Sequence, residues 1–151
     1  ASVVTLVGLP LTLIRLWQTK KIVDETVQKL RSNQLMVVLP QLRSTEIALD
    51  KAVRDGDLDS SIALTSAWRS SANRLRALLP RDSASTELAD LLRTSVTLAA
   101  DAKRKLVALK AAPSDQIERT TRAFRKSAAT IADEADVWET KMATQPEGNT
   151  K

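Results

Sequence analysis

Three aspartates at alternate positions form the pattern in this sequence that comes closest to a metal-binding motif. Asp55, Asp57 and Asp59 lie in the stretch DGDLDS, as the first ligands of an EF-hand calcium loop do. Ser60 stands where that loop needs a glycine, and Ser66 stands where it needs a bidentate glutamate. We therefore interpret the aspartates as helix-terminus residues, and we predict no metal site.

The residue types that carry most acid–base and nucleophilic catalysis are absent. The sequence contains no Cys, His or Tyr, so it lacks thiol nucleophiles, the imidazole proton shuttle and the phenol group. We also find no pair of acids placed on one apolar face, where their pKa values would be shifted. The sequence therefore predicts a protein that is not an enzyme and that uses no cofactor and no small-molecule substrate.

Basic residues gather on both sides of Pro113, where we expect a turn between the last two helices. Residues 101–126 include eight basic and three acidic residues. This excess suits an anionic partner: a lipid headgroup, a nucleic acid or an acidic protein surface. The candidate anion-binding or partner-binding residues are Lys103, Arg104, Lys105, Lys110, Arg119, Arg122, Arg125 and Lys126.

A simpler interpretation of this basic cluster is a solvated face, and we favour it. Lysines at the end of one helix, and Asp115 and Glu118 at the start of the next, complement the two helix dipoles. Nucleic acid is the less favoured partner because Phe124, the aromatic residue near the turn, falls on an apolar seam and is not placed for base stacking.

Helices are the elements expected to position these residues. Aromatic residues make up only 3% of the chain, which has three glycines and five prolines, a composition typical of long helices. Gly56 is expected to end one helix in the left-handed conformation, and Pro80 and Pro113 to follow the ends of two others. The candidate N-caps after these breaks are Asp59 or Ser60, then Ser83 or Ser85, then Ser114.

Apolar and small residues recur at helical spacing between these breaks. The last block gives the clearest seam, with Ile117, Thr121, Phe124, Ala128, Ile131, Ala135, Trp138 and Met142. The block before it gives Leu88, Leu91, Ser95, Leu98, Ala102, Leu106 and Leu109, and the one before that gives Leu64, Trp68, Ala72, Leu75 and Leu79. We predict an all-α fold, an antiparallel helical bundle of four or five helices with a long C-terminal helical hairpin.

Pro40 lies inside a further helical pattern formed by Leu35, Leu39, Leu42, Leu49 and Val53. A proline within a helix removes one backbone hydrogen bond and clashes with the preceding turn. We expect a kink at Pro40. The alternative is a helix break near Asn33, with Ser32 or Asn33 as the cap.

The N-terminal stretch VVTLVGLPLTLIRLWQTKK is strongly apolar. Residues 1–14 carry no charged side chain, and as a helix they would extend roughly 21 Å, less than the ~30 Å hydrocarbon layer of a membrane. Arg15 could snorkel, with Trp17 at the headgroups and two lysines beyond. The predicted membrane-contact residues are Val4, Leu6, Val7, Leu9, Leu11, Leu13, Ile14, Arg15, Trp17, Lys20 and Lys21.

Membrane association is the expectation we favour for this stretch, and a buried central helix of a soluble bundle is the alternative. Basic residues that follow the apolar run predict a membrane-anchored protein whose helical domain is cytoplasmic. The sequence begins at Ala1 and not at Met, so we expect a cleaved or truncated form that has lost part of a longer apolar helix.

Three stretches, LVGLPLTLIRLWQTKK, NQLMVVLPQLRSTEIALDKAVRDGD and AWRSSANRLRALL, carry a resemblance. Together they resemble a loose class of bacterial proteins of unassigned role that have an N-terminal membrane helix and a helical cytoplasmic region. The resemblance spans about residues 5–79 and implies a membrane-proximal, bacterial setting. It brings no residue roles with it.

These observations together predict an apolar membrane-associated segment at 1–19, a helical bundle domain at 20–143 and a disordered tail at 144–151. The expected function is that of a membrane-tethered, non-enzymatic scaffold or regulatory module with membrane lipid and a protein partner, or a second copy of itself, as partners. The first alternative is a soluble oligomeric binding protein with its N-terminal helix buried. The second is a binder of nucleic acid or anionic lipid through the basic cluster.

Overall fold

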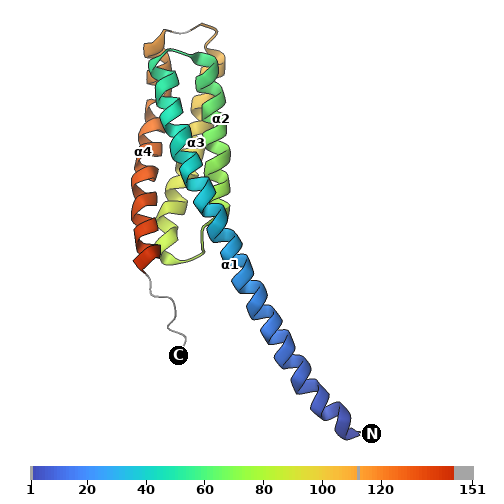
Figure 1. Ribbon diagram of the computed structural model, residues 1–151. Coiled ribbons are helices and arrows are strands. Elements are labelled where there is room, and N and C mark those ends of the chain that lie inside the picture. The colour runs from blue at the N-terminus through green and yellow to red at the C-terminus, as the bar shows by residue number, and fades with distance from the viewer. Residues whose placement is uncertain (1, 112, 145–151) are drawn as a thin grey trace. The chain divides into compact units, whose positions relative to one another are not determined.

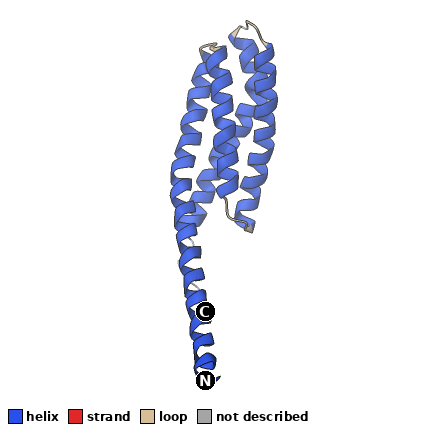
Figure 2. Ribbon diagram, turned by 90° about the vertical axis from the view of Figure 1, so that its right-hand side faces the viewer, coloured by secondary structure: helices blue, strands red, loops and turns tan. Residues whose placement is uncertain are grey.

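The computed structural model describes residues 2–111 and 113–144, with side chains from residue 15 onward. These residues form four α-helices and no strand: α1 (Ser2–Arg54), α2 (Leu58–Leu78), α3 (Ser83–Ala108) and α4 (Ser114–Thr144) (Figures 1 and 2). The chain divides into two units, Ala1–Met36 and Val37–Lys151. The prediction of an all-α fold with helices packed against one another is confirmed.

The turn between α1 and α2 is built around Gly56. Its φ of 68° is the left-handed conformation predicted for the helix end. The N-cap of α2 is Asp57, whose carboxylate accepts from the Ser60 backbone N–H at 3.0 Å and from the Ser60 hydroxyl at 2.7 Å. The predicted caps, Asp59 and Ser60, are wrong because both already lie inside α2, which begins directly after Asp57.

The cap of α3 is likewise an aspartate where serine was predicted. The Asp82 carboxylate accepts from the Ser85 backbone N–H at 2.8 Å. Ser83 is the first residue of α3 and Ser85 lies in its first turn, so neither is the cap. Ser114 is similarly the first residue of α4. The end of α2 at Leu78, shortly before Pro80, agrees with the proline signal.

The core of the second unit is formed by all four helices. Trp68 of α2 and Phe124 of α4 are both buried and meet edge to face, with ring centroids 4.8 Å apart. α3 packs against both α2 and α4. From α1, the buried apolar residues are Val38, Leu39, Leu42, Leu49, Ala52 and Val53.

The predicted seam of α4 is confirmed from Ile117 to Trp138, all seven positions being buried. On α3 the seam is partly wrong. Leu91 and Leu98 are half-buried, and the buried positions beside them are Leu92 and Ala99. The reason is that α3 contacts a helix on each side, so its buried face is broader than one line of residues.

Several hydroxyl residues in or beside this core form hydrogen bonds within the fold, either to the preceding turn of their own helix or to a neighbouring helix. Thr65 donates to the Ser61 carbonyl oxygen at 2.7 Å, and Thr121 donates to the Ile117 carbonyl oxygen at 2.9 Å. Ser95 of α3 and Ser127 of α4 share a hydrogen bond between their hydroxyls. These four hydroxyl groups therefore do not add the free-energy cost of an unpaired buried polar group.

The predicted membrane anchor is wrong. Among the residues whose side chains are described, no helix is long and apolar enough to cross a membrane. Arg15, Trp17, Lys20 and Lys21 are exposed, and from residue 15 to 31 the helix carries five basic and two acidic residues, which a hydrocarbon layer does not accommodate. The expectation of a membrane-anchored protein with a cytoplasmic helical domain is corrected accordingly.

Some earlier expectations fall outside the described residues. The side chains of the other predicted membrane-contact residues, Val4, Leu6, Val7, Leu9, Leu11, Leu13 and Ile14, are among them. So are residues 145–151 of the predicted disordered tail. The alternative of a helix break near Asn33 is wrong, because α1 continues through Asn33 and Pro40.

Candidate interaction surfaces

Residues 15–36 of α1 expose a row of large apolar side chains. Leu16, Val23, Val27 and Leu30 are each between 40% and 60% exposed, and we call these four residues the α1 stripe. Their spacing of seven, four and three residues is that of the inner positions of a coiled coil. A helix with this pattern normally buries the row against a second helix.

Other exposed apolar side chains flank the α1 stripe. Trp17 follows the first stripe residue and is 78% exposed, and Ile22 and Met36 are also exposed. A tryptophan this accessible is uncommon in a folded protein, because its large ring is normally buried. The exposed apolar surface of this segment is therefore wider than the stripe alone.

Charged residues lie both within the line of the α1 stripe and at its edge. Between Leu16 and Leu30, the coiled-coil pattern has one charged inner position, and Lys20 occupies it. Asp24 and Arg31 each directly follow a stripe residue. The Thr19 and Thr26 hydroxyls donate to the Arg15 and Ile22 carbonyl oxygens, both at 2.8 Å, so they do not face outward for a partner.

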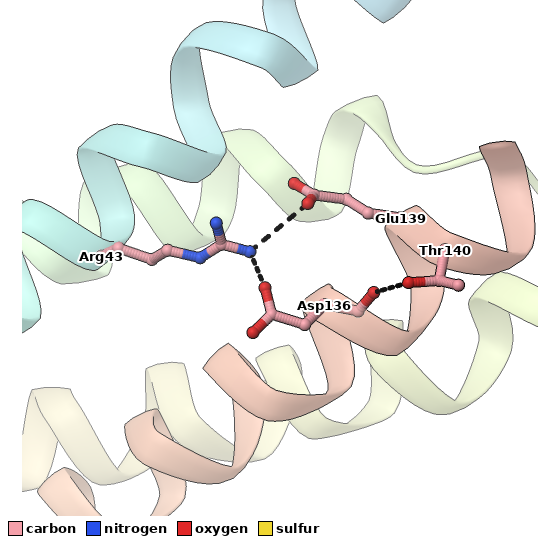
Figure 3. Close-up of polar contacts among 4 residues, drawn as sticks. All are labelled: Arg43, Asp136, Glu139 and Thr140. Atoms are coloured by element: carbon pink, nitrogen blue, oxygen red, sulfur yellow. Dashed lines mark hydrogen bonds and ion pairs between the residues drawn. The ribbon is translucent and has the colours of Figure 1, made fainter.

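Charged residues on α1 and α4 form the polar edge of the bundle. The Arg43 guanidinium forms ion pairs with Asp136 and, at 3.5 Å, with Glu139 (Figure 3). One helical turn away, the Thr140 hydroxyl donates to the Asp136 backbone carbonyl oxygen at 2.9 Å (Figure 3). The partners of Arg43 lie within the fold, so this arginine already has an intramolecular role.

A second contact between these helices involves one of the predicted anion-binding residues. Arg125 Nε donates to Asp50 at 2.7 Å, and its side chain is largely buried. Nearby, burial, together with the negative charges of Asp50 and Asp133, raises the pKa of Glu46. Arg125 therefore stabilises the contact between α1 and α4 and is not directed at solvent.

Three other residues of the basic cluster have carboxylates on their own helix. Arg104 and, at 2.8 Å, Lys105 pair with Asp101, and the lysine and arginine contacts hold the pKa of that aspartate below its usual value. Arg122 lies 3.7 Å from Glu118. These pairs are exposed, so each contributes little to stability, but they lower the net positive potential of the cluster.

The remaining four residues of the cluster are Lys103, Lys110, Arg119 and Lys126. No carboxylate among the described residues lies within ion-pair distance of them. Lys110, Arg119 and Lys126 are exposed and Lys103 is half-buried. The structure thus divides the predicted cluster into four paired and four unpaired residues, and anion binding there stays a prediction.

Of the three aspartates of DGDLDS, Asp57 has a structural role. Asp57 caps α2, and its hydrogen bonds to the side chain and backbone of Ser60 lower its pKa. Within the described part of the chain, no three or more acidic side chains are grouped to hold a metal ion. The interpretation of these aspartates as helix-terminus residues agrees with the cap at Asp57.

The α1 stripe was not identified from the sequence, although its spacing is visible there. Lys20 interrupts the row, and the more apolar stretch before residue 15 dominates the hydropathy of this region. The missing information was which apolar residues of α1 lack a contact in the fold.

Comparison with protein-family models, with curated proteins and with solved structures finds no match to this chain.

Proposed function

We propose that this protein is a non-enzymatic helical interaction module, in which residues 37–144 form a supporting bundle and the α1 stripe contacts a protein partner. The observation that carries this proposal is the exposure of Leu16, Val23, Val27 and Leu30 together on one helix. Contiguous exposed apolar rows of this kind mark sites of association. Outside residues 15–36 of the described chain, Val37 is exposed directly after Met36, and Ile47, Val107 and Val137 are exposed singly on three different helices.

Burial of this row would favour association. Full burial of one Val or Leu side chain stabilises by roughly 1.5–3 kcal/mol, so four half-exposed residues would contribute roughly 3–6 kcal/mol. A helix without a packing partner is also marginally stable in water, because most helical stability comes from burial of an apolar face. A partner for residues 15–36 would supply that burial.

The bundle is suited to a supporting role. In the arrangement we propose, α3 and α4 form an antiparallel hairpin. Two contacts support it, because residue numbers rise along α3 as they fall along α4: Ser85 contacts Trp138, and Ser95 contacts Ser127. A hairpin held by buried side chains and hydrogen bonds gives a rigid base on which a contact segment of the same chain can be carried.

The absence of common catalytic side chains from the sequence supports the non-enzymatic part of the proposal. The sequence has no Cys, His or Tyr. The carboxyl group with a raised pKa, Glu46, lies near Asp50 and Asp133, and Asp50 is paired with Arg125. The Asp50–Arg125 pair beside it serves a packing contact between α1 and α4.

Site-specific photo-crosslinking in the cells that natively make the protein tests this function. Trp17 is replaced with p-benzoylphenylalanine, an aromatic residue beside the α1 stripe, and Arg69, an exposed residue of α2, is replaced in the matched control. We expect an adduct of discrete mass from position 17 and none from position 69. The absence of a discrete adduct at position 17, or the same adducts at both positions, would overturn the proposal.

A second candidate function is binding of a nucleic acid by the basic cluster. The observation in its favour is that Lys110, Arg119 and Lys126 are exposed and have no carboxylate partner among the described residues. Affinity for a labelled oligonucleotide would fall steeply with salt. It would also fall in a triple variant with Gln at these three positions, a set that leaves the ion pair of Arg125 intact.

The matched control for this second candidate changes three arginines on the exposed face of α2. Arg69, Arg74 and Arg76 are exposed and lie outside the basic cluster. Replacing them with Gln removes the same amount of charge. Equal loss of affinity in the two triple variants would show that net charge alone binds the oligonucleotide, and would reject a site in the cluster.

A further inference from the structure

We infer that the partner of the α1 stripe is a second copy of this chain, bound as a two-stranded antiparallel coiled coil. This inference rests on the proposed function and names its partner. The first argument is the repeat itself. Leu16, Val23, Val27 and Leu30 follow a 3.5-residue period, which fits the holes on another helix of the same period and does not fit a flat surface or a sheet.

Charge decides the direction of the second copy. In a parallel pair, Lys20 of one copy would face Lys20 of the other at the centre of the interface, and like charges there are unfavourable. In an antiparallel pair with Val27 of one copy opposite Leu30 of the other, the two lysines lie apart. Each lysine then faces Val37 of the second copy, while Val23 and Leu16 face the uncharged Gln34 and Gln41.

The same antiparallel alignment brings opposite charges together on the flanks. Asp24 and Arg31 both follow stripe residues and are seven residues apart. When the second helix runs in the opposite direction with its Leu30 opposite Val27, Asp24 of each copy lies beside Arg31 of the other copy. The dimer would therefore contain this ion pair twice, whereas a parallel pair would place threonines opposite both charges.

The area of the interface sets the expected strength. A fully exposed Val or Leu side chain has an apolar area of about 100 Å². The eight half-exposed stripe residues of two copies would therefore bury roughly 400 Å² in the dimer. The exposed parts of two Trp17 side chains add roughly 300 Å². With the flanking polar stems the total approaches about 1,000 Å², the lower end of specific interfaces. We therefore expect a reversible dimer with a dissociation constant in the micromolar range, on the order of 1–100 μM.

Sedimentation equilibrium of the full chain tests the dimer. The double variant Val27→Asn and Leu30→Asn should raise the dissociation constant at least tenfold, because two apolar contacts are lost from each copy. The matched control places asparagine at Gln18 and Ser32, which are exposed positions on the opposite side of the same helix. The control should dimerise like the unmodified chain.

A charge-reversal cycle tests the direction of the second copy. Asp24→Arg or Arg31→Asp alone should each raise the dissociation constant about threefold to tenfold at low salt, and the two changes together should restore it. A parallel dimer predicts no restoration, because the two positions would not meet. All of these positions are exposed, so the bundle core should unfold at the same urea concentration in every variant.

Three results would overturn the inference. They are a monomer at all concentrations up to about 100 μM, an unchanged dissociation constant in the Val27 and Leu30 double variant, and failure of the charge-reversed double variant to recover. The photo-crosslinking experiment keeps this result separate from the proposed function. An adduct of Trp17 with a different protein would leave the function standing and reject the second copy as partner.

Discussion

The hydrogen bond between Trp138 and Ser85 gives a sharp test of the packing between α3 and α4. Trp138 Nε1 donates to Ser85 Oγ at 3.0 Å, and both residues are buried. Ser85→Ala leaves the buried indole N–H without its protein partner. A buried donor left unpaired costs roughly 1–3 kcal/mol, so we expect a loss of about 2 kcal/mol in the free energy of unfolding.

Urea unfolding followed by circular dichroism measures this loss. For a bundle of roughly 110 residues we expect a midpoint lower by about 1 M urea and a melting temperature lower by about 8 °C. Ser83→Ala is the control, because Ser83 is exposed at the first position of the same helix, and it should change stability by no more than about 0.5 kcal/mol.

A double-mutant cycle separates the hydrogen bond from other effects of the substitution. Trp138→Phe removes the indole N–H, so Ser85→Ala should cost less than about 0.5 kcal/mol in that background. If Ser85→Ala costs the same about 2 kcal/mol with either residue at position 138, the loss does not come from the hydrogen bond. The reasoning about this contact would then be refuted.

Two further predictions concern single positions of the bundle. Gly56→Ala should lower the free energy of unfolding by about 1–2 kcal/mol in urea titrations, because Gly56 has a φ of 68° and an added Cβ would lie 3.2 Å from Ser114 Cβ; an unchanged midpoint would contradict this. Burial, with Asp50 and Asp133 nearby, raises the pKa of Glu46 above 4.5. The folded state therefore binds the Glu46 carboxyl proton more tightly than the unfolded state does. As a result, ionised Glu46 destabilises the fold once the pH has risen through this raised pKa. Glu46→Gln should therefore stabilise the protein at neutral pH, with the gain disappearing below pH 4.5; a gain that persists in acid would argue against this cause.

Much of the helical framework could be predicted from the residues alone. The seam of α4 was predicted position by position because it is a single narrow line from Ile117 to Trp138. The helix end at Gly56 was predicted because a glycine in this setting adopts a positive φ at little cost. These features are local and need no knowledge of neighbouring helices.

The predictions that were wrong concern features that depend on contacts with neighbouring helices or on the residue at which a helix begins. Leu91 and Leu92 are both leucines on α3, and only contacts with the helices on each side determine that Leu92 is fully buried. The caps at Asp57 and Asp82 were missed because each stretch offers several capping residues. Which one caps depends on the residue at which the helix begins.

The candidate surfaces show the same division. The positions of the basic residues were visible, but their ion pairs were not, because Asp50 lies 75 residues before Arg125 in the chain. The α1 stripe was missed for the opposite reason. Its residues look like core residues, and only the fold shows that no part of the described chain covers them.

Amide hydrogen exchange of the unmodified chain tests the central claim most directly, because it reads out residues 16–30 without any substitution. At about 100 μM these amides should be protected, since the second copy covers the helix, and at about 1 μM they should exchange rapidly while the core amides of α3 and α4 keep their protection. Equal exchange of residues 16–30 at both concentrations would contradict association through the α1 stripe.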